Sequence, residues 1–211
     1  MTSVVSVFFS SFLIAFSGAM MPGPLLSATI EKSAKHGAVT GPLFMLGHAV
    51  LEILLIVLLF LGVAPLLQSP LFFTVVSILG GLIMGWMGIG MVRGLSSLTL
   101  NARNKVPDYK SLVVTGAVLS LSNPYWTVWW ATIGLGFILS ASKLGYIGVA
   151  VFFLGHILAD VLWYSAVSLT ITRGKKLLND TAYRVIIGVC AMLLIGFGIM
   201  FMIRGIVSYE T

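Results

Sequence analysis

Long apolar runs separated by short polar stretches make up most of the chain. A helix that crosses the hydrocarbon core of a bilayer needs about 20 consecutive apolar residues, so runs of that length predict membrane spans. We therefore expect an all-α integral membrane protein with six transmembrane helices, in one transmembrane domain over residues 1–211. The six runs cover approximately residues 3–30, 38–67, 71–93, 111–140, 144–171 and 184–208.

Charged residues inside these runs are rare, and two of them belong to a repeated motif. A Gly-His-x-x-x-acid pattern pairs His48 with Glu52 in the second run and His156 with Asp160 in the fifth. Residues four apart share one face of a helix, so each pair points in one direction. Ionisable groups at mid-membrane are costly to keep there, which makes them candidates for function. The alternative is a structural role, in which each imidazole hydrogen-bonds its neighbours and holds the helices together.

Prolines interrupt the first and fourth runs at comparable places. The first contains Pro22-Gly23-Pro24 and the fourth contains Asn123-Pro124. Proline removes a backbone donor and clashes with the preceding turn, so both helices should be broken or sharply kinked. Such backbone is tolerated in a membrane only where it faces protein or a water-filled cavity. A plain kink that shapes packing is the alternative interpretation of each proline.

Six spans divide into two sets of three, and an odd number of spans per half makes the second half cross the membrane in the opposite sense. The sequence therefore predicts a 3+3 inverted-topology repeat, with halves at approximately residues 1–98 and 108–211. Broken helices at matching positions of such a repeat are typical of a transporter binding site at the membrane midplane.

For Glu52 and Asp160, the charged and the protonated forms should have similar free energies at mid-membrane. Inserting a charged acid at mid-membrane costs about 2.5–3.5 kcal/mol. Protonating a Glu of reference pKa near 4.3 at pH 7 costs about 3.7 kcal/mol, which nearly balances it. The adjacent histidines widen the pH range over which protons can be exchanged. We therefore expect an ion-coupling group made of His48, Glu52, His156 and Asp160.

Four aromatic residues follow the second proline break: Tyr125, Trp126, Trp129 and Trp130. Interfacial aromatic belts sit at the ends of spans, whereas these rings fall near the middle of one. Together they can line a cavity and offer a cation–π face to an ammonium group, although packing in the core is the simpler role of any single ring. The predicted substrate-binding residues are Pro22, Gly23, Pro24, Asn123, Pro124, Tyr125 and Trp126.

Composition excludes a soluble domain, since 59% of residues are hydrophobic, 9% are charged and the mean hydropathy is +1.10. The net charge of +6 does not indicate nucleic-acid binding, because ten of the twelve basic residues fall in the connections after the first, third and fifth runs. Under the positive-inside rule these connections are cytoplasmic, and both termini lie outside. The longest connection, residues 93–110, links the halves.

Other chemistry finds little support in the sequence. One cysteine, Cys190, excludes an internal disulfide and a paired-thiol electron carrier. No phosphate-binding glycine loop of the ATPase type and no nucleophile arrangement occur, so neither ATP as a driving force, nor an enzyme, nor a bound cofactor is expected.

The chain resembles the lysine exporter (LysE/RhtB-type) amino-acid translocator family. The resemblance rests on six spans in about 210 residues, on Pro22-Gly23-Pro24, on the basic turn at 31–36 with Gly37 and Gly41 after it, and on Asn123-Pro124. It implies a secondary active transporter in the plasma or inner membrane that exports amino acids or related small metabolites and is driven by an ion gradient. The four ionisable groups make protons the expected coupling ion. The partners implied are an amino-acid substrate and the bilayer, and a homodimer is left open.

A second hypothesis comes from the same four ionisable groups. Two neutral imidazoles and two carboxylates that face one another can bind Zn²⁺, Mn²⁺ or another divalent ion, as a metal-efflux carrier requires. We rank it second, because a metal carrier gives the tryptophan cluster no role and because no His-rich or Cys-rich loop is present to collect metal.

Overall fold

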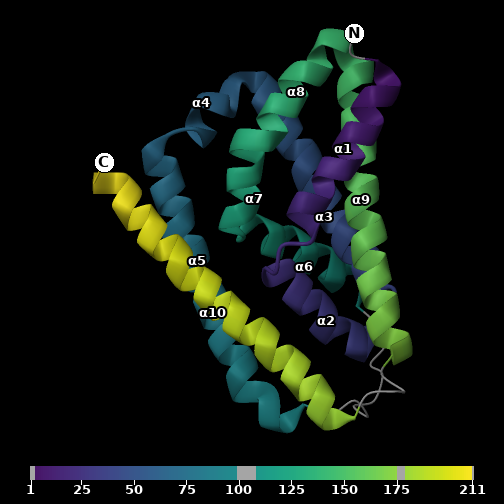
Figure 1. Cartoon of the computed structure of the whole chain (residues 1–211), viewed down its shortest axis with the longest axis vertical. Coiled ribbons are helices and arrows are strands. Elements are labelled where there is room, and N and C mark those ends of the chain that lie inside the picture. Colours follow the sequence, from purple (N-terminus) through teal and green to yellow (C-terminus); the bar gives the residue numbers. More distant parts are fainter. Residues whose placement is uncertain (1–2, 99–107, 175–178, 211) are drawn as a thin grey trace.

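The computed structural model describes residues 3–98, 108–174 and 179–210, which form helices joined by short turns, without strands (Figure 1). Within this part, four stretches are long and apolar enough to cross a membrane, and a bent pair of helices makes five if it counts as one span. The chain is therefore an all-helical multi-pass membrane protein. The four stretches are Thr40–Leu67, Pro70–Ser97, Pro124–Gly174 and Asp180–Val207.

Part of the basic face predicted from the sequence lies outside the described residues. The residues concerned are Arg103 and Lys105, in the longest connection, and Lys175 and Lys176.

The bent pair consists of α1 (Val4–Ala19) and α2 (Pro24–His36), whose axes differ by 79°. Helix α1 starts with a capping box between Ser3 and Ser6. Proline suits the first position of α2, because its missing N–H would have no partner there and its φ is already helical. The run expected to be one span thus consists of two helices at a wide angle.

The second run is also interrupted, and the sequence analysis missed this interruption. Helix α3 (Thr40–Leu58) continues through a π-helical turn, η1 (Leu59–Val63), into α4 (Ala64–Leu67). Gly62 lies in that turn with a φ of +93°, which glycine adopts without the steric cost that a Cβ brings.

Three long helices complete the membrane-length elements. Helix α5 (Pro70–Gly94) is capped by Ser69 and runs into a short 3₁₀ turn, η2 (Leu95–Ser97). The other two are α9 (Gly145–Gly174) and α10 (Asp180–Glu210).

The second proline break separates short helices. Helix α6 (Tyr109–Leu121) ends two residues before Asn123, whose side chain accepts a hydrogen bond from the backbone N–H of Tyr125. The chain then passes through α7 (Pro124–Trp129), η3 (Trp130–Gly134), α8 (Leu135–Ala141) and η4 (Ser142–Leu144).

Gly145 reverses the chain between α8 and α9, with a φ of +69°. In Figure 1, α7 and α8 rise to the top of the molecule and α9 descends from there. The apolar stretch Pro124–Gly174 is therefore two legs joined by a turn. The turn lies at the same end of the molecule as the labelled N-terminus.

The glycine of each Gly-His motif brings two helices close together. A Cβ on Gly47 of α3 would overlap the carbonyl oxygen of Val113 in α6. A Cβ on Gly155 of α9 would lie 2.6 Å from the carbonyl oxygen of Phe8 in α1. The motif thus places each histidine one residue after the closest approach of α3 to α6 and of α9 to α1.

Helices α5 and α10 pack along each other and form one side of the molecule (Figure 1). Small residues line their contact, where a Cβ on Gly81 would lie 2.6 Å from the carbonyl oxygen of Gly198. A hydrogen bond of 3.0 Å from Thr74 Oγ1 to the Gly205 carbonyl crosses the same contact. Such close backbone approach is the usual way in which helices associate in lipid.

Candidate substrate and ion site

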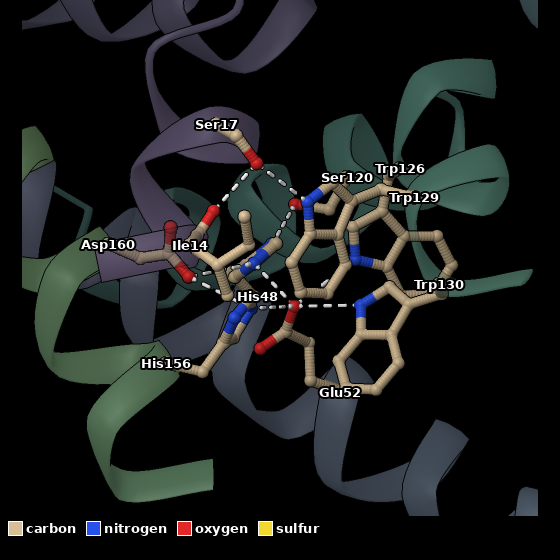
Figure 2. A network of polar contacts seen from close by, with 10 residues as sticks. All are labelled: Ile14, Ser17, His48, Glu52, Ser120, Trp126, Trp129, Trp130, His156 and Asp160. Atoms are coloured by element: carbon tan, nitrogen blue, oxygen red, sulfur yellow. Dashed lines mark hydrogen bonds and ion pairs between the residues drawn. The ribbon is translucent and has the colours of Figure 1, made fainter. Parts of the chain in front are cut away.

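Helices α3 and α9 bring the two His-x-x-x-acid pairs together in the interior of the molecule (Figure 2). His48 and Glu52 stand one turn apart on α3, and His156 and Asp160 stand one turn apart on α9. All four side chains are buried, and one ligand atom from each lies within 4.8 Å of the other three. The structure thus assembles one cluster from residues that are more than 100 positions apart in the sequence.

Within the cluster, each imidazole lies near both carboxylates. His48 Nε2 is 2.9 Å from Glu52 Oε1 and 3.7 Å from Asp160 Oδ2. His156 Nε2 is 3.1 Å from Glu52 Oε1 and 3.3 Å from Asp160 Oδ2. With neutral imidazoles and ionised acids the cluster has two negative charges, so two added protons, or one divalent cation, make it neutral. A buried group with unbalanced charge is costly, so neutral states are favoured.

Two indole rings fix one oxygen of Glu52. Trp130 Nε1 donates to Glu52 Oε1 over 3.0 Å and Trp126 Nε1 over 3.3 Å. An indole nitrogen only donates, so this oxygen is held as an acceptor. In the described part of the chain, the other oxygen, Oε2, is buried without a hydrogen-bond partner. One oxygen of the carboxyl group is therefore anchored and the second remains available.

Ser120 at the end of α6 orients His48. The Ser120 hydroxyl donates to the Gly116 carbonyl over 2.8 Å and lies 2.7 Å from His48 Nδ1. A hydroxyl has a single hydrogen, so while Ser120 donates to Gly116 its oxygen accepts from the Nδ1–H of His48. In the neutral imidazole the lone pair of Nε2 then points at Glu52 and Asp160.

The two helix breaks lie next to each other. Tyr125 donates its hydroxyl to the Ser17 carbonyl over 3.1 Å, and Trp129 Nε1 donates to the Ser17 hydroxyl over 3.1 Å. Helix α1 ends shortly after Ser17, where carbonyl groups have no partner within the helix, so the Tyr125 bond satisfies one of these carbonyls. A Cβ on Gly23 would lie 3.3 Å from Asn123 Nδ2. The backbone of the first break is therefore in close contact with the side chain of the second.

A cavity of about 40 Å³ borders the cluster. One water molecule needs about 10–15 Å³ by this measure, whereas sites for small-molecule ligands enclose about 300–1,000 Å³. The cavity is therefore large enough for water, and the helices around it must separate before an amino acid can enter. Its lining comprises Ala15, Gly18, Ala19, Leu25, His48, Glu52, Ser120, Asn123, Tyr125, Trp126, Trp129, Trp130, His156, Asp160 and Tyr164.

A model of the LysE type translocator family matches residues 16–205, which includes both helix breaks and all four members of the cluster. The chain belongs to the LysE type translocator family. Members of this family are transporters rather than enzymes, as the sequence analysis expected for this chain. No solved structure matches the chain.

Two relatives of this LysE type translocator align over almost its full length. The "Putative amino acid efflux protein YcgF" of Bacillus subtilis is 23% identical over 205 residues, which is 96% of this chain and 98% of the relative. The "Chemotactic transduction protein ChpE" of Pseudomonas aeruginosa is 24% identical over 195 residues, which is 92% of this chain and 96% of the relative. Similarity to a protein whose name is that of a putative amino acid efflux protein thus covers 96% of the translocator.

The structure divides the substrate-binding residues predicted for the translocator between two cavities. Asn123, Tyr125 and Trp126 line the cavity beside the cluster. Pro22 and Gly23 line a smaller neighbouring cavity of about 10 Å³, together with Asn123 and Tyr125. The remaining two residues, Pro24 and Pro124, are buried, and Pro124 packs against Gly80 of α5.

The sequence analysis missed Ser17 and Ser120 as partners of the site. It grouped Trp130 with the cavity lining, where the structure places it, but did not predict that Trp130 also donates a hydrogen bond to Glu52. Trp126 and Trp130 are four residues apart, and this spacing could have indicated that both indoles face one point. The two serines show no comparable pattern, because only the packing of α6 against α3 and of α7 against α1 gives them their partners.

Proposed function

We propose that this translocator exports an amino acid or a closely related zwitterionic metabolite from the cytoplasm, and that its efflux is coupled to protons. The observation that carries the proposal is the cluster of His48, Glu52, His156 and Asp160, which stands beside a cavity lined by tryptophan rings. The similarity to an amino acid efflux protein supports the choice of substrate.

The site offers partners for both ends of a zwitterion. Glu52 Oε2 and Asp160 Oδ2 are buried acceptors without a hydrogen bond in the described part of the chain, and an ammonium group supplies the donors that they lack. The rings of Trp126 and Trp129 add an apolar and cation–π surface. The carboxylate end then faces the adjoining cavity at Pro22 and Gly23, where α2 begins.

Proton coupling follows from the charge of the cluster. In its neutral state the cluster holds two exchangeable protons among four groups. The ammonium group of an arriving substrate adds one positive charge to the cluster, while the carboxylate lies in the adjoining cavity, so release of one proton restores the neutrality of the cluster. A carrier that exchanges substrate for protons in this way on each side of the membrane exports the substrate while protons move inward.

An inverted repeat with six spans is the architecture that we propose for this transport cycle. Its first half contributes α1 to α5 and its second half contributes α6 to α10. The packing supports it, because Gly47 approaches the first helix of the second half and Gly155 approaches the first helix of the first half. Helices α5 and α10, the last of each half, pack on each other. We place the protein in the plasma or inner membrane with both termini outside.

Transport by the purified protein tests this function. Reconstituted in liposomes with a panel of labelled amino acids, the wild type should move at least one of them, faster with a proton gradient than without one. Glu52→Gln and Asp160→Asn keep the shape of each acid but fix an uncharged form. We expect either change to lower net efflux by about tenfold or more, to abolish its pH dependence and to leave part of the substrate exchange.

Glu31→Gln is the matched control. Glu31 is a partly exposed acid of α2 that pairs with Lys35 one turn away, outside the cluster. Its loss should leave efflux unchanged. If efflux by Glu52→Gln and by Asp160→Asn remains dependent on pH, the cluster is excluded as the coupling group.

A further inference from the structure

The arrangement of the cluster points to a second ligand. We infer that His48, Glu52, His156 and Asp160 form a four-coordinate site for a divalent transition-metal ion, best fitted by Zn²⁺, and that the bound ion blocks efflux. The binding site stands on geometry alone, and only its effect on efflux rests on the proposed function.

The distances in the cluster lie within about 0.4 Å of the edges of a zinc coordination tetrahedron. Zinc binds imidazole nitrogen and carboxylate oxygen at about 2.0–2.2 Å, so neighbouring ligand atoms in a tetrahedron are about 3.3–3.6 Å apart. The four distances between Nε2 atoms and carboxylate oxygens are 2.9, 3.1, 3.3 and 3.7 Å. All pairs of ligand atoms in the set lie within 4.8 Å. An ion at the centre requires only small shifts of these side chains.

The surroundings hold the ligands in the orientation that a metal needs. Ser120 accepts the Nδ1–H of His48 and leaves the Nε2 lone pair directed into the cluster. A metal-bound histidine usually donates its other N–H in this manner. The indoles of Trp126 and Trp130 hydrogen-bond Glu52 Oε1 and hold its carboxyl group in place.

Charge and unmet hydrogen bonding favour the same occupant. Two neutral imidazoles, two carboxylates and one divalent cation sum to zero, which makes burial of the whole site feasible. Asp160 Oδ2 is buried and makes no hydrogen bond in the described part of the chain, and a cation gives it a partner.

The ligand set selects among metals. Magnesium and calcium prefer six or more oxygen ligands, whereas half of the ligand set here consists of imidazole nitrogens. Soft ions prefer thiolates, and this cluster has none. Two imidazoles with two carboxylates in a tetrahedral arrangement fit Zn²⁺, and Co²⁺ is its usual spectroscopic substitute.

A bound ion would oppose transport in two ways. It would occupy Asp160 Oδ2, one of the two carboxylate oxygens that the ammonium group of a substrate needs. It would also join α3 to α9 through two ligands from each helix. Sub-stoichiometric zinc in an efflux assay should therefore reduce the rate in proportion to the sites filled.

Calorimetry on the purified full chain tests the site without any transport. We use a Cys190→Ala background, so that the free thiol does not bind the metal. The expected result is one Zn²⁺ per chain. His156→Ala should weaken binding by about tenfold or more, and Ser120→Ala, which retains all four ligands, by about 10–100-fold. His36→Ala, which removes a histidine outside the cluster, should change nothing.

Co²⁺ bound to the same background gives a second readout. Four-coordinate Co²⁺ absorbs visible light much more strongly than six-coordinate Co²⁺, so we expect an intense band that is displaced by one equivalent of Zn²⁺. This measurement needs no substitution in the cluster and holds even where His156→Ala fails to fold. Absence of stoichiometric Zn²⁺ binding, a weak six-coordinate Co²⁺ spectrum, or binding that persists in well-folded His156→Ala would overturn the inference.

The liposome assay separates this inference from the proposed function. Amino-acid efflux that Zn²⁺ does not inhibit, in a protein that binds no Zn²⁺, supports the proposed function and overturns the metal site. The protein could instead bind Zn²⁺ stoichiometrically and transport it, without moving any amino acid. That result would uphold the metal site, overturn its inhibitory role and make the chain a metal carrier.

Discussion

Glu52 is a buried acid that contacts side chains from several helices. Its side chain is 1% exposed, and its Oε1 atom lies within 3.3 Å of four nitrogen atoms from three segments of the chain. Hydrogen bonds to a charged group contribute about 1.5–3 kcal/mol each, more than bonds between neutral groups. The indole donors of Trp126 and Trp130 therefore stabilise both the charge of Glu52 and the position of α7 against α3.

We predict that Trp130→Phe destabilises the protein by about 1–3 kcal/mol, because it removes a donor from a buried carboxylate while filling most of the same space. Unfolding of the purified protein in detergent measures this loss. Trp163→Phe is the matched control, since the indole nitrogen of Trp163 is buried without a hydrogen-bond partner in the described part of the chain. Equal stability of Trp130→Phe and wild type would show that the Trp130 bond adds nothing.

The helices are positioned by small residues at a few crossings. Gly47 and Gly155 precede the two histidines of the cluster and lie at the contacts of α3 with α6 and of α9 with α1. A larger side chain at either position would push the helix away from its neighbour and would move the next residue, a histidine, out of the cluster. Packing between helices and geometry of the site are therefore set by the same residues.

Gly47→Ala and Gly155→Ala are each predicted to cost about 1–3 kcal/mol of stability, because the added methyl group overlaps backbone atoms that cannot move aside. Both should also reduce efflux, measured in the same liposomes. Gly85→Ala, in α5, is the control, since no atom lies within 4 Å of a Cβ built there. The idea fails if both motif variants are as stable and as active as Gly85→Ala.

Two basic segments of the described chain lie toward opposite ends of the molecule. Helix α2, which contains Lys32, ends near the bottom of Figure 1, whereas the turn between α8 and α9, which contains Lys143, lies at the top. From the positive-inside rule and the basic connections of the sequence, we predict that the bottom of this view faces the cytoplasm.

Single cysteines test this orientation. In a Cys190→Ala background, Lys32→Cys should be protected from an impermeant thiol reagent in right-side-out vesicles, and Lys143→Cys should be labelled. The reverse pattern would place the α2 end outside and both termini in the cytoplasm.

Sequence patterns anticipated the helices better than the site. The apolar run 71–93 corresponds to α5 at 70–94, and the run 144–171 to α9 at 145–174, because length and hydropathy alone define a membrane helix. The turn at Gly62 escaped notice, since nothing in its neighbours distinguishes it from a glycine inside a helix. Helix period predicted that each histidine shares a face with its acid, and the repeat suggested that the pairs meet. The role of Ser120 depends on the crossing of α3 and α6, which no local pattern encodes.

The partners of Glu52 also determine an order of events during synthesis. His48 precedes Glu52 by one turn, but Trp126, Trp130 and His156 emerge from the ribosome more than 70 residues later. Helix α3 therefore enters the membrane with a carboxyl group that has only one of its final neighbours. Until those later residues enter the membrane, the free-energy cost of inserting the acid is lowest in its protonated form or while the insertion machinery holds it. The first half of this protein is thus an unfinished intermediate, and the arrival of the second half completes its most polar contact.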